Sequence, residues 1–381
     1  MRKSFLYRLY PNKVQSDKLA GMVNAARHLY NAALQERRDA YRMQHKSLNY
    51  FDQSDELKGL RQEFPEIAEL NCSAAQDMLR RLDKSFKAFF RRIKHGEKPG
   101  FPRFKGYNRF NSITFPTYGD GIKMKDNRLY VRNAGLIKIK VHRSLEGEIN
   151  TVTIKRDGDK WYAVFSNTVD IKPLPVSDRE IGIDVGLESF AVTSGNEYIE
   201  NPHCLKRNLR RLRVIQRSVS RKKLGGRNRK KAVKILASMH RKIKNQRKEF
   251  HHYTANRIVK SYGYIAAEKL QIDNMLGNHH LAQSISDVGW GQFMSILSYK
   301  AEYAGRVFTQ VNPNGTSQVC SSCGTKVPKD LSIRIHHCPV CGISLNRDYN
   351  AALNILTLGR SVWDVTWNRG SCVSQEAVCF S

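Results

Sequence analysis

The chain has 381 residues, with 65 Lys and Arg against 34 Asp and Glu, which gives a formal net charge of +31. The length predicts two or three domains, and 40% hydrophobic residues exclude a purely disordered basic tail. No stretch approaches the ~18 consecutive apolar residues of a membrane span, and the N-terminus lacks the apolar run of a secretory signal. A polyanion, most simply nucleic acid, is therefore the expected partner; a ribosome-associated or merely basic protein is the alternative.

The N-terminal half predicts β-structure interrupted by helices. Residues 1–10 alternate apolar and basic side chains and predict a strand. From residue 13 to about 95 the apolar period is helical, with Asn71 or Ser73 expected as one N-cap. Short alternating runs over residues 100–173 predict a small β-barrel or sandwich, to which residues 1–10 could add a strand. One helical stripe is interpreted as a core face: Met78, Leu82, Phe86, Phe89 and Ile93.

Beyond Pro173 and Pro175 the pattern becomes that of an α/β domain, with no internal repeat. A helix is expected through residues 253–260, and another carries Trp290 and Ala301 on one face. Apolar runs predict strands at residues 180–185, 189–193, 264–267 and 307–311.

The positive charge is concentrated between Lys206 and Lys248, where 43 residues contain 19 Lys or Arg and no acid. Apolar residues recur there at helical spacing and Gly225-Gly226 interrupts them, so two antiparallel helices with an apolar seam are expected. A solvated surface normally mixes both signs, so the absence of acids favours contact with a nucleic-acid backbone. The residues expected to make that contact are Arg210, Arg211, Arg217, Arg221, Lys222, Lys223, Arg229, Lys230, Arg241, Lys244 and Arg247.

Four of the eight cysteines form two CxxC pairs, Cys320 with Cys323 and Cys338 with Cys341, separated by fourteen residues. Four thiolates complete a tetrahedral Zn²⁺ shell and leave no open position, so one structural zinc is expected. A glycine follows the second Cys of each pair, where a knuckle turn favours a residue that tolerates positive φ. A pair of disulfides is the alternative, which an intracellular setting disfavours.

Three carboxylates stand out by context. Asp184 and Glu268 each end a hydrophobic strand, and Asp348 starts a helical run beyond the cysteine pairs. If the three converge, they could hold two Mg²⁺ ions, which prefer oxygen ligands and hydrolyse phosphodiesters in pairs ~3.5–4 Å apart. Nearby acids whose settings indicate caps or surface positions are Asp178, Glu180, Glu188 and Asp287.

Several short motifs together carry a family resemblance that covers about residues 1–360. They are Gly182-Ile-Asp184-Val-Gly186, Ala-Ala-Glu268-Lys-Leu, Val-Gly-Trp290-Gly, Cys320-Ser-Ser-Cys323-Gly and Asn346-Arg-Asp348-Tyr-Asn-Ala-Ala, with Tyr7-Arg-Leu-Tyr-Pro11-Asn and Gly100-Phe-Pro-Arg-Phe-Lys105. The set resembles TnpB, a family of transposon-encoded, RNA-guided DNA endonucleases related to the compact type V CRISPR effectors.

The resemblance implies a multidomain α/β and α+β fold with an RNase H-like (RuvC) nuclease domain, an inserted zinc ribbon, and a wedge β-barrel interrupted by a helical recognition domain. By motif position, Asp184, Glu268 and Asp348 would be the catalytic residues and the ligands of two Mg²⁺ ions. Tyr50, Ser54 and Gln76 would lie near a surface that reads a short motif in the target. The implied boundaries are 1–12 and 96–173 for the wedge, 13–95 for the helical domain, 174–316 and 346–362 for the nuclease domain with its basic hairpin 206–248, 317–345 for the ribbon, and 363–381 for a C-terminal tail.

The expected function is therefore that of a Mg²⁺-dependent DNA endonuclease. Its guide RNA, from the transposon end, would pair with one strand of double-stranded DNA beside a short motif. An RNA-guided regulator that binds without cleaving, and a transposase that uses a 3′-hydroxyl as nucleophile, are the alternatives. The expected location is the cytoplasm of a bacterium or archaeon, at the nucleoid and without membrane association. The oligomeric state stays open.

Overall fold

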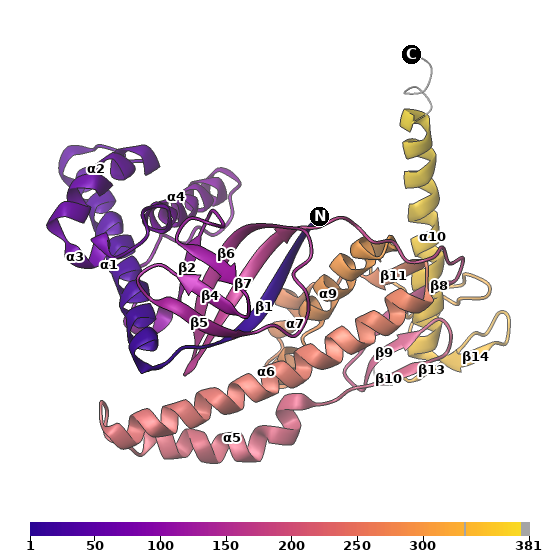
Figure 1. Ribbon diagram of the computed structural model, residues 1–381. Coiled ribbons are helices and arrows are strands. Elements are labelled where there is room, and N and C mark those ends of the chain that lie inside the picture. Colours follow the sequence, from indigo (N-terminus) through magenta and orange to yellow (C-terminus); the bar gives the residue numbers. More distant parts are fainter. Residues whose placement is uncertain (331–332, 375–381) are drawn as a thin grey trace, which may run out of the picture. The chain divides into compact units, whose positions relative to one another are not determined.

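The computed structural model describes residues 1–330 and 333–374. The chain divides after Asp170 into two compact units (Figure 1). Each unit has its own sheet and its own buried core, so each is described by itself.

The first unit is built on a seven-stranded antiparallel sheet with the strand order β2-β6-β7-β1-β5-β4-β3. The N-terminal strand β1 pairs with β5 on one side and β7 on the other, so the prediction that residues 1–10 extend this sheet is confirmed. Alternate residues of β1, namely Phe5, Tyr7 and Leu9, are buried, and their neighbours face outward. The strands are β1 (Arg2–Tyr10), β2 (Ser112–Phe115), β3 (Ile122–Lys125), β4 (Arg128–Val131), β5 (Gly135–Lys140), β6 (Glu148–Asp157) and β7 (Lys160–Thr168).

Four helices stand between β1 and β2 in the chain, and a 3-10 turn at Tyr107–Arg109 follows them. The Asn71 side chain accepts a hydrogen bond from the backbone N of Ala74, so Asn71 is the cap of α4. Met78 and Leu82 are buried as expected, but Ile93 is 50% exposed and Phe86 and Phe89 pack edge-on against Phe101 of the following loop. The predicted core face is therefore wrong for the last turns of α4. The helices are α1 (Lys13–Gln44), α2 (Tyr50–Glu63), α3 (Pro65–Ala68) and α4 (Cys72–Lys94).

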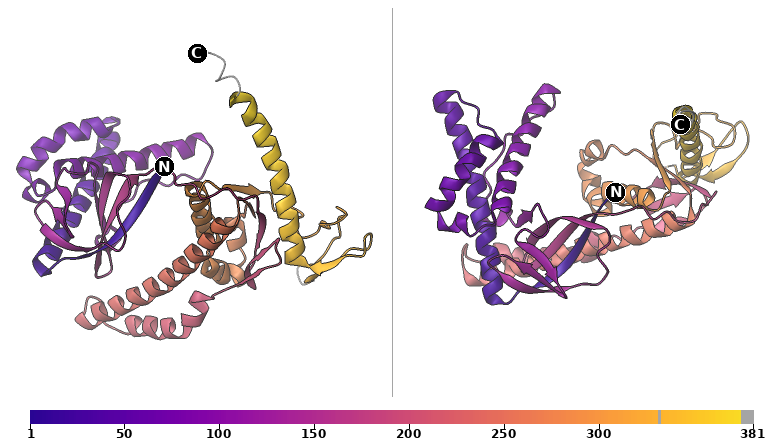
Figure 2. Two further views of the ribbon diagram at one scale, coloured as in Figure 1. Left: turned by 45° about the vertical axis from the view of Figure 1, so that its right-hand side comes forward. Right: turned by 45° about the horizontal axis from the view of Figure 1, so that its top comes forward.

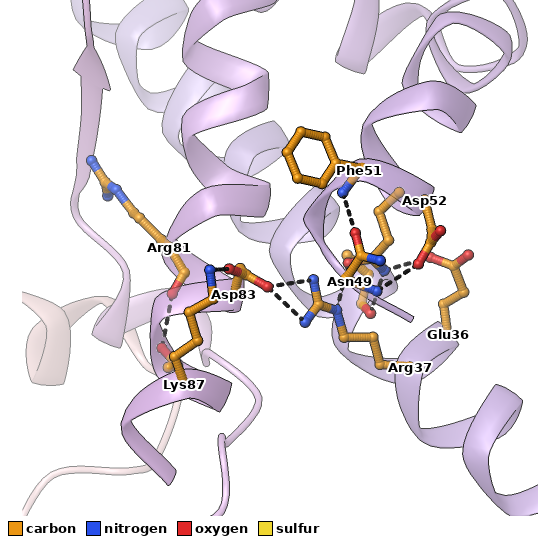
Figure 3. Close-up of polar contacts among 11 residues, drawn as sticks. Glu36, Arg37, Asn49, Phe51, Asp52, Arg81, Asp83 and Lys87 are labelled. Atoms are coloured by element: carbon orange, nitrogen blue, oxygen red, sulfur yellow. Dashed lines mark hydrogen bonds and ion pairs between the residues drawn. The ribbon is translucent and has the colours of Figure 1, made fainter. Parts of the chain in front are cut away.

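A buried polar network holds α1, α2 and α4 together (Figure 3). Nε of Arg37, in α1, donates to Oε1 of Gln53 at 2.8 Å, and its Nη1 lies 3.3 Å from Oδ1 of Asp83 in α4. The Gln53 amide in turn donates to the carbonyl of Ala33 at 2.8 Å, and Lys87 binds the other oxygen of Asp83. Because breaking a buried pair leaves one charge uncompensated, this network fixes α2 relative to its neighbours.

The second unit contains a mixed five-stranded sheet with the order β10-β9-β8-β11-β12. Strands β8, β9 and β10 are antiparallel, whereas β11 runs parallel to β8 and to β12. The four strands that the sequence predicts in this region are present. The strands of the sheet are β8 (Glu180–Val185), β9 (Ser189–Thr193), β10 (Tyr198–Glu200), β11 (Tyr264–Glu268) and β12 (Val307–Val311).

Helices cover both faces of this sheet. Alternate residues Ile181, Ile183 and Ile265 join a core with α6 and α9, whereas Tyr264 and Ala266 pack with Ile355 of α10 on the opposite face. The second unit is thus a three-layer α/β/α arrangement. Its helices are α5 (Cys204–Ser220), α6 (Arg227–Ser261), α7 (Ile272–Leu276), α8 (His279–Val288), α9 (Trp290–Tyr303) and α10 (Arg347–Ser374).

The basic segment forms the expected antiparallel pair, α5 and α6 (Figure 2). Leu212, Met239 and Ile243 are buried in their seam, with Ile215 and Leu236 packed against them. The separate helix predicted at residues 253–260 is wrong: those residues are the last turns of α6, since no glycine or proline interrupts Arg227–Ser261.

A small two-stranded sheet, β13 (Ile335–His337) with β14 (Ser344–Asn346), precedes α10. The helix α10 continues across the expected boundary at residues 362 and 363, and residues 375–381 of the expected tail lie outside the described residues. Within the described residues, no helix combines the length and the apolar character that crossing a membrane requires.

Candidate active site and metal centre

The four cysteines of the two CxxC pairs meet at one point. The Sγ atoms of Cys320 and Cys341 lie 3.6 Å apart, those of Cys323 and Cys338 lie 3.5 Å apart, and all four fall within 4.8 Å of one another. Sulfurs ~2.3 Å from one Zn²⁺ at tetrahedral corners are about 3.8 Å apart, so the quartet fits zinc.

The knuckle turns of this quartet explain the glycines in the sequence. Gly324 and Gly342 have φ of 76° and 72°, the left-handed region that glycine adopts without a Cβ penalty. The backbone N of each glycine donates to the carbonyl of the first cysteine of its pair, at 3.0 and 2.9 Å. The sequence prediction of positive φ at these two positions is confirmed.

The helix α10 lies directly on β8 at Gly182. A Cβ added to Gly182 would lie 2.2 Å from the carbonyl oxygen of Ala352, so only glycine permits this approach. Asp184 is two residues along β8 and therefore faces the same side of the sheet as Gly182. Asp348 is one turn before Ala352 and lies on the same side of α10. The close contact thus brings the carboxylates of Asp184 and Asp348 to one end of the helix–sheet layer.

The third carboxylate joins them through the parallel pairing of β11 with β8. Ala267 pairs with Ile183, so Glu268 and Asp184 are the next residues along their strands and face the same side. Glu268 is only 8% exposed, and the hydroxyl of Thr316 donates to its Oε1 at 2.6 Å. The three predicted residues therefore gather at the carboxyl end of two adjacent strands.

Electrostatics identifies Asp184 as the centre of this group. Burial raises the pKa of Asp184 well above its usual value, and the negative charges of Glu268 and Asp348 raise it further against the opposing charge of Arg347. Burial also raises the pKa of Glu268, against the hydrogen bond from Thr316. A carboxylate that two others disfavour in this way is one that a bound cation would stabilise.

Two arginines pair with the carboxylate of Asp348. Nε of Arg347 lies 3.5 Å from Oδ1 of Asp348, and Nη1 of Arg334 lies 3.8 Å from Oδ2. Nη2 of Arg334 lies 3.1 Å from Glu188, which identifies that acid as an ion-pair partner at the surface. Asp348 is thus oriented before any ligand arrives.

The chemistry of the carboxylates fits Mg²⁺, which prefers carboxylate oxygens. Among the described residues, the cysteine quartet is the one metal-capable group whose ligand atoms all lie within 4.8 Å, so the carboxylates are spread more widely. A pair of ions ~3.5–4 Å apart is compatible with such a spread, because each carboxylate need not touch both ions.

Three polar residues support this site without having been predicted: Thr316, Asn350 and Asn354. The Nδ2 of Asn350, which is fully buried on α10, donates to the carbonyl of Val319 at 2.8 Å, and its Oδ1 accepts from the N of Ser321. Asn354 lies one turn further along and donates to the carbonyl of Thr316 at 2.8 Å. The sequence signal for Asn350 and Asn354 was the Asn-x-x-x-Asn spacing on an apolar helix. Their hydrogen bonds connect the cysteine region to α10.

The rival acids have the structural roles that their settings indicate. Asp287 accepts hydrogen bonds from the backbone N of Leu205 and of Lys206, and so caps α5 from another helix. Glu180 pairs with Arg360 at 2.5 Å.

The predicted nucleic-acid contacts fall in two places. The basic residues of the second unit lie on α5, on α6 and in the turn between them, and most are exposed. Arg247 differs, because its Nη1 donates to the carbonyls of Ser286 and Asp287 and so attaches α6 to α8.

In the first unit, Ser54 of α2 and Gln76 of α4 line one groove of about 420 Å³, together with Lys58 and Arg61. The ring of Tyr50 lies 5.1 Å from the guanidinium of Arg80.

Three family profiles match parts of the chain: "Cas12f1-like, TNB domain" over residues 290–355, "Probable transposase" over residues 163–279, and "Helix-turn-helix domain" over residues 1–46. A TnpB-like protein of Acanthamoeba polyphaga mimivirus is 29% identical over 230 residues, which is 56% of this chain and 44% of the relative. A Streptomyces pristinaespiralis protein named "Putative RNA-guided DNA endonuclease" is 32% identical over 368 residues, 94% of this chain and 90% of the relative. This chain belongs to the TnpB family.

Other members and neighbours agree with this assignment. The Escherichia coli K12 relative, "Putative RNA-guided DNA endonuclease InsQ", is 26% identical and covers 94% of this chain and 93% of the relative. The solved Cas12f1-sgRNA-target DNA complex contains a chain with a TM-score of 0.60 and 16% identity, covering 93% of this TnpB-family chain and 98% of that chain. At this identity the match shows a shared mixed α/β fold.

Proposed function

We propose that this TnpB-family protein is a transposon-associated, RNA-guided DNA endonuclease that hydrolyses phosphodiester bonds in its target. The observation that carries the proposal is the gathering of Asp184, Glu268 and Asp348 at the end of β8, β11 and α10, where Asp184 is disfavoured as an anion. The names of the relatives point the same way.

The five-stranded sheet with helices on both faces supports an RNase H-like, RuvC-type nuclease domain, in which the three carboxylates would be the catalytic residues. When bound, two Mg²⁺ ions would supply an activated water and stabilise the leaving oxygen. Asp184, Glu268 and Asp348 would hold the ions, and Asp184 is the residue whose pKa both of the other two raise. Thr316 would fix the carboxylate of Glu268, while Arg334 and Arg347 would orient Asp348.

The remaining parts take supporting roles in the proposal. Residues 1–12 and 96–173 would be the wedge barrel, 13–95 the helical recognition domain, 174–316 and 346–362 the nuclease domain, and 317–345 a structural zinc ribbon. The α5–α6 hairpin would hold the backbone of the guide RNA or of its hybrid with DNA. The groove lined by Ser54 and Gln76 would face the short motif beside the target, with Tyr50 near it. The guide would come from the transposon end, and the DNA of the bacterial or archaeal nucleoid would be the substrate.

The test is cleavage by the protein purified with its co-transcribed RNA, on matched and mismatched duplex DNA with Mg²⁺ or with EDTA. Asp184→Ala should abolish cleavage and retain binding. Asp178→Ala, which removes an exposed carboxylate six residues earlier, is the matched control and should cut normally. Cleavage by Asp184→Ala at the wild-type rate would refute the assigned site.

Two other outcomes would favour the alternative functions. Guided binding without cleavage in Mg²⁺ would indicate a regulator, against which the retention of all three carboxylates argues. Strand-transfer products formed without RNA would indicate a transposase.

A further inference from the structure

The cysteine quartet has a buried and an exposed side. Cys320 and Cys338, the first cysteine of each CxxC pair, are 1% and 0% exposed. Cys323 and Cys341, the second cysteine of each pair, are exposed. Each of these two is followed directly by the exposed glycine of its knuckle turn, so the turn itself lies at the surface. We call the sulfurs of the first two residues the inner sulfurs and those of the other two the outer sulfurs.

Each outer sulfur contacts an inner sulfur of the other CxxC pair. The outer Sγ of Cys341 lies 3.6 Å from the inner Sγ of Cys320. The outer Sγ of Cys323 lies 3.5 Å from the inner Sγ of Cys338. Each exposed sulfur therefore has a buried sulfur beside it as a partner for a disulfide, and such a bond would join one knuckle to the other.

A cation lies beside the inner sulfurs. The ammonium of Lys329 donates to the carbonyl of Ser317 at 3.4 Å. Burial and the charge of Arg347 lower the pKa of Lys329, and the negative charges of the two inner sulfurs raise it. The outer sulfur of Cys323 lies instead 3.3 Å from the neutral hydroxyl of Thr325. The positive charge of Lys329 therefore stabilises the inner thiolates more than the outer ones.

Access separates the four sulfurs as targets of an oxidant. Zinc binds cysteine as the thiolate, so a bound zinc ion would hold all four sulfurs in their nucleophilic form. Oxidation of a cysteine depends on its thiolate character and on its exposure to solvent. The outer sulfurs combine both properties, whereas the inner sulfurs are buried beside a cation. An exposed thiolate with a second thiolate next to it is also the arrangement that redox-sensing cysteines have.

We propose that Cys323 and Cys341 are sites of oxidative modification by a two-electron oxidant of the peroxide class, which cross-links the two knuckles. In each couple the outer thiolate attacks the O–O bond of the peroxide, which gives a sulfenic acid and one hydroxide. The inner thiolate then attacks that sulfur, and the oxygen leaves as a second hydroxide. Two thiolates thus lose two electrons to one peroxide. The disulfides would be Cys320–Cys341 and Cys323–Cys338, and because each removes two of the four zinc ligands, zinc would be released.

The oxidation would reach the carboxylate site through α10. Asn350 is hydrogen-bonded to the carbonyl of Val319 and to the backbone N of Ser321, the two neighbours of Cys320 in the chain. Asp348 lies two residues before Asn350 in the same helix. Oxidation would therefore stop DNA cleavage, and a thiol reductant together with Zn²⁺ would restore it. This consequence for cleavage rests on the proposed function, whereas the oxidation of the quartet does not.

The test uses the full chain with Cys72→Ser, Cys372→Ser and Cys379→Ser, which leaves the quartet and the buried Cys204 as its thiols. Hydrogen peroxide is added stepwise to the zinc-loaded protein, and a metallochromic dye measures the zinc released. Dimedone traps sulfenic acids, and mass spectrometry maps them together with the disulfides. About two equivalents of peroxide should release the zinc, with dimedone on Cys323 and Cys341 and with both disulfides crossing between the knuckles.

A variant without outer thiolates is Cys323→His with Cys341→His, because two cysteines and two histidines also hold structural zinc. This variant should keep its zinc at the peroxide dose that empties the parent protein. Lys326→Gln removes an exposed charge of the same ribbon and is the control, which should release zinc as the parent does. Should the histidine variant not bind zinc, alkylation of the parent protein by N-ethylmaleimide gives the answer, since the outer sulfurs should react before the inner ones.

The outcomes separate this inference from the proposed function. Disulfides within each CxxC pair, or reaction of the inner sulfurs first, would overturn the inference. Zinc loss from the histidine variant at the parent rate would also overturn it. Full cleavage by an oxidised, zinc-free protein would overturn the link to the carboxylate site. A reduced, zinc-loaded protein that does not cleave would instead count against the proposed function, and the zinc and disulfide measurements would still decide the inference.

Discussion

Replacing Gly182 with alanine adds one methyl group between β8 and α10. Its carbon would lie 2.2 Å from the carbonyl oxygen of Ala352, 2.8 Å from the backbone N of Leu356 and 2.9 Å from the Cβ of Leu356. Real Cβ atoms essentially never approach closer than 3.0 Å, and two of these three atoms are backbone that no rotamer change can move. The helix must therefore shift away from the sheet by about 1 Å.

This shift has two consequences of different size. Overpacking of a buried contact costs about 1–3 kcal/mol, which for a unit of this length lowers the unfolding temperature by about 3–10 °C. Asp348 begins the same helix one turn earlier, so it moves relative to Asp184. A misplacement of about 1 Å in a catalytic group reduces rates by about 100-fold. Gly182→Ala should therefore reduce the cleavage rate far more than it reduces the fraction of folded protein.

The assay is single-turnover cleavage of matched duplex DNA, run well below the unfolding temperature measured for each variant. Gly195→Ala is the control, because an added Cβ there would meet its nearest atom, Oγ1 of Thr193, at 3.7 Å. The control should match wild type in both rate and unfolding temperature. If Gly182→Ala cleaves as fast as Gly195→Ala, the positions of the carboxylates do not depend on how α10 packs on β8, and the reasoning fails.

Three further predictions concern stability and the metal centre. Arg37→Met should lower the free energy of unfolding by about 3–5 kcal/mol, because it leaves the buried Asp83 with an incomplete set of partners. The double variant Arg37→Met, Asp83→Leu should regain much of this stability, as measured by urea titration. Burial lowers the pKa of His251 to about 4, so the unfolded chain takes up this proton at a higher pH than the folded protein. The stability contributed by the neutral ring is about 3 kcal/mol above pH 6.5 and is lost as the pH falls towards 4. His251→Gln should flatten this part of the pH–stability curve. Chelation of zinc, or Cys338→Ser, should abolish cleavage, because Asn350 of α10 is hydrogen-bonded to the cysteine region; full activity of a zinc-free protein by metal analysis would contradict this coupling.

The features that sequence predicted well are those that neighbouring residues determine. The seam of the hairpin followed from apolar residues at helical spacing, and Leu212 and Met239 are buried in it. The turns at Gly324 and Gly342 followed from the local need for positive φ. The strand at residues 1–10 and the strands β8, β9, β11 and β12 followed from alternation or from short apolar runs. In each case the cause lies within a few residues of the effect, so a single sequence contains it.

The features that sequence missed depend on residues far apart in the chain. The hydrogen bond from Thr316 to Glu268 joins residues 48 positions apart. The exposure of Ile93 in α4 could not be foreseen, because an apolar helical stripe does not reveal where its packing partner ends. The setting of Asp287 indicates a cap or a surface position without showing which, because the helix that it caps begins 83 residues earlier, at Cys204. Such contacts become visible only when the elements are assembled.

In the assembled structure, the exposed cations and the buried carboxylates of this basic protein lie in different places. The cations of α5 and α6 are mostly exposed, so that contact with a phosphate backbone there would add to affinity and salt would weaken it. The carboxylates of Asp184 and Glu268 lie at the end of β8 and β11, where burial raises the pKa of both and salt screens their repulsion little. A proton or a small cation that reaches this edge relieves the repulsion, whereas a phosphate backbone alone would increase it. Arg334 and Arg347 pair with Asp348, and Arg347 offsets the repulsion at Asp184 only in part. We therefore expect a metal ion to bind on the side of Asp184 and Glu268.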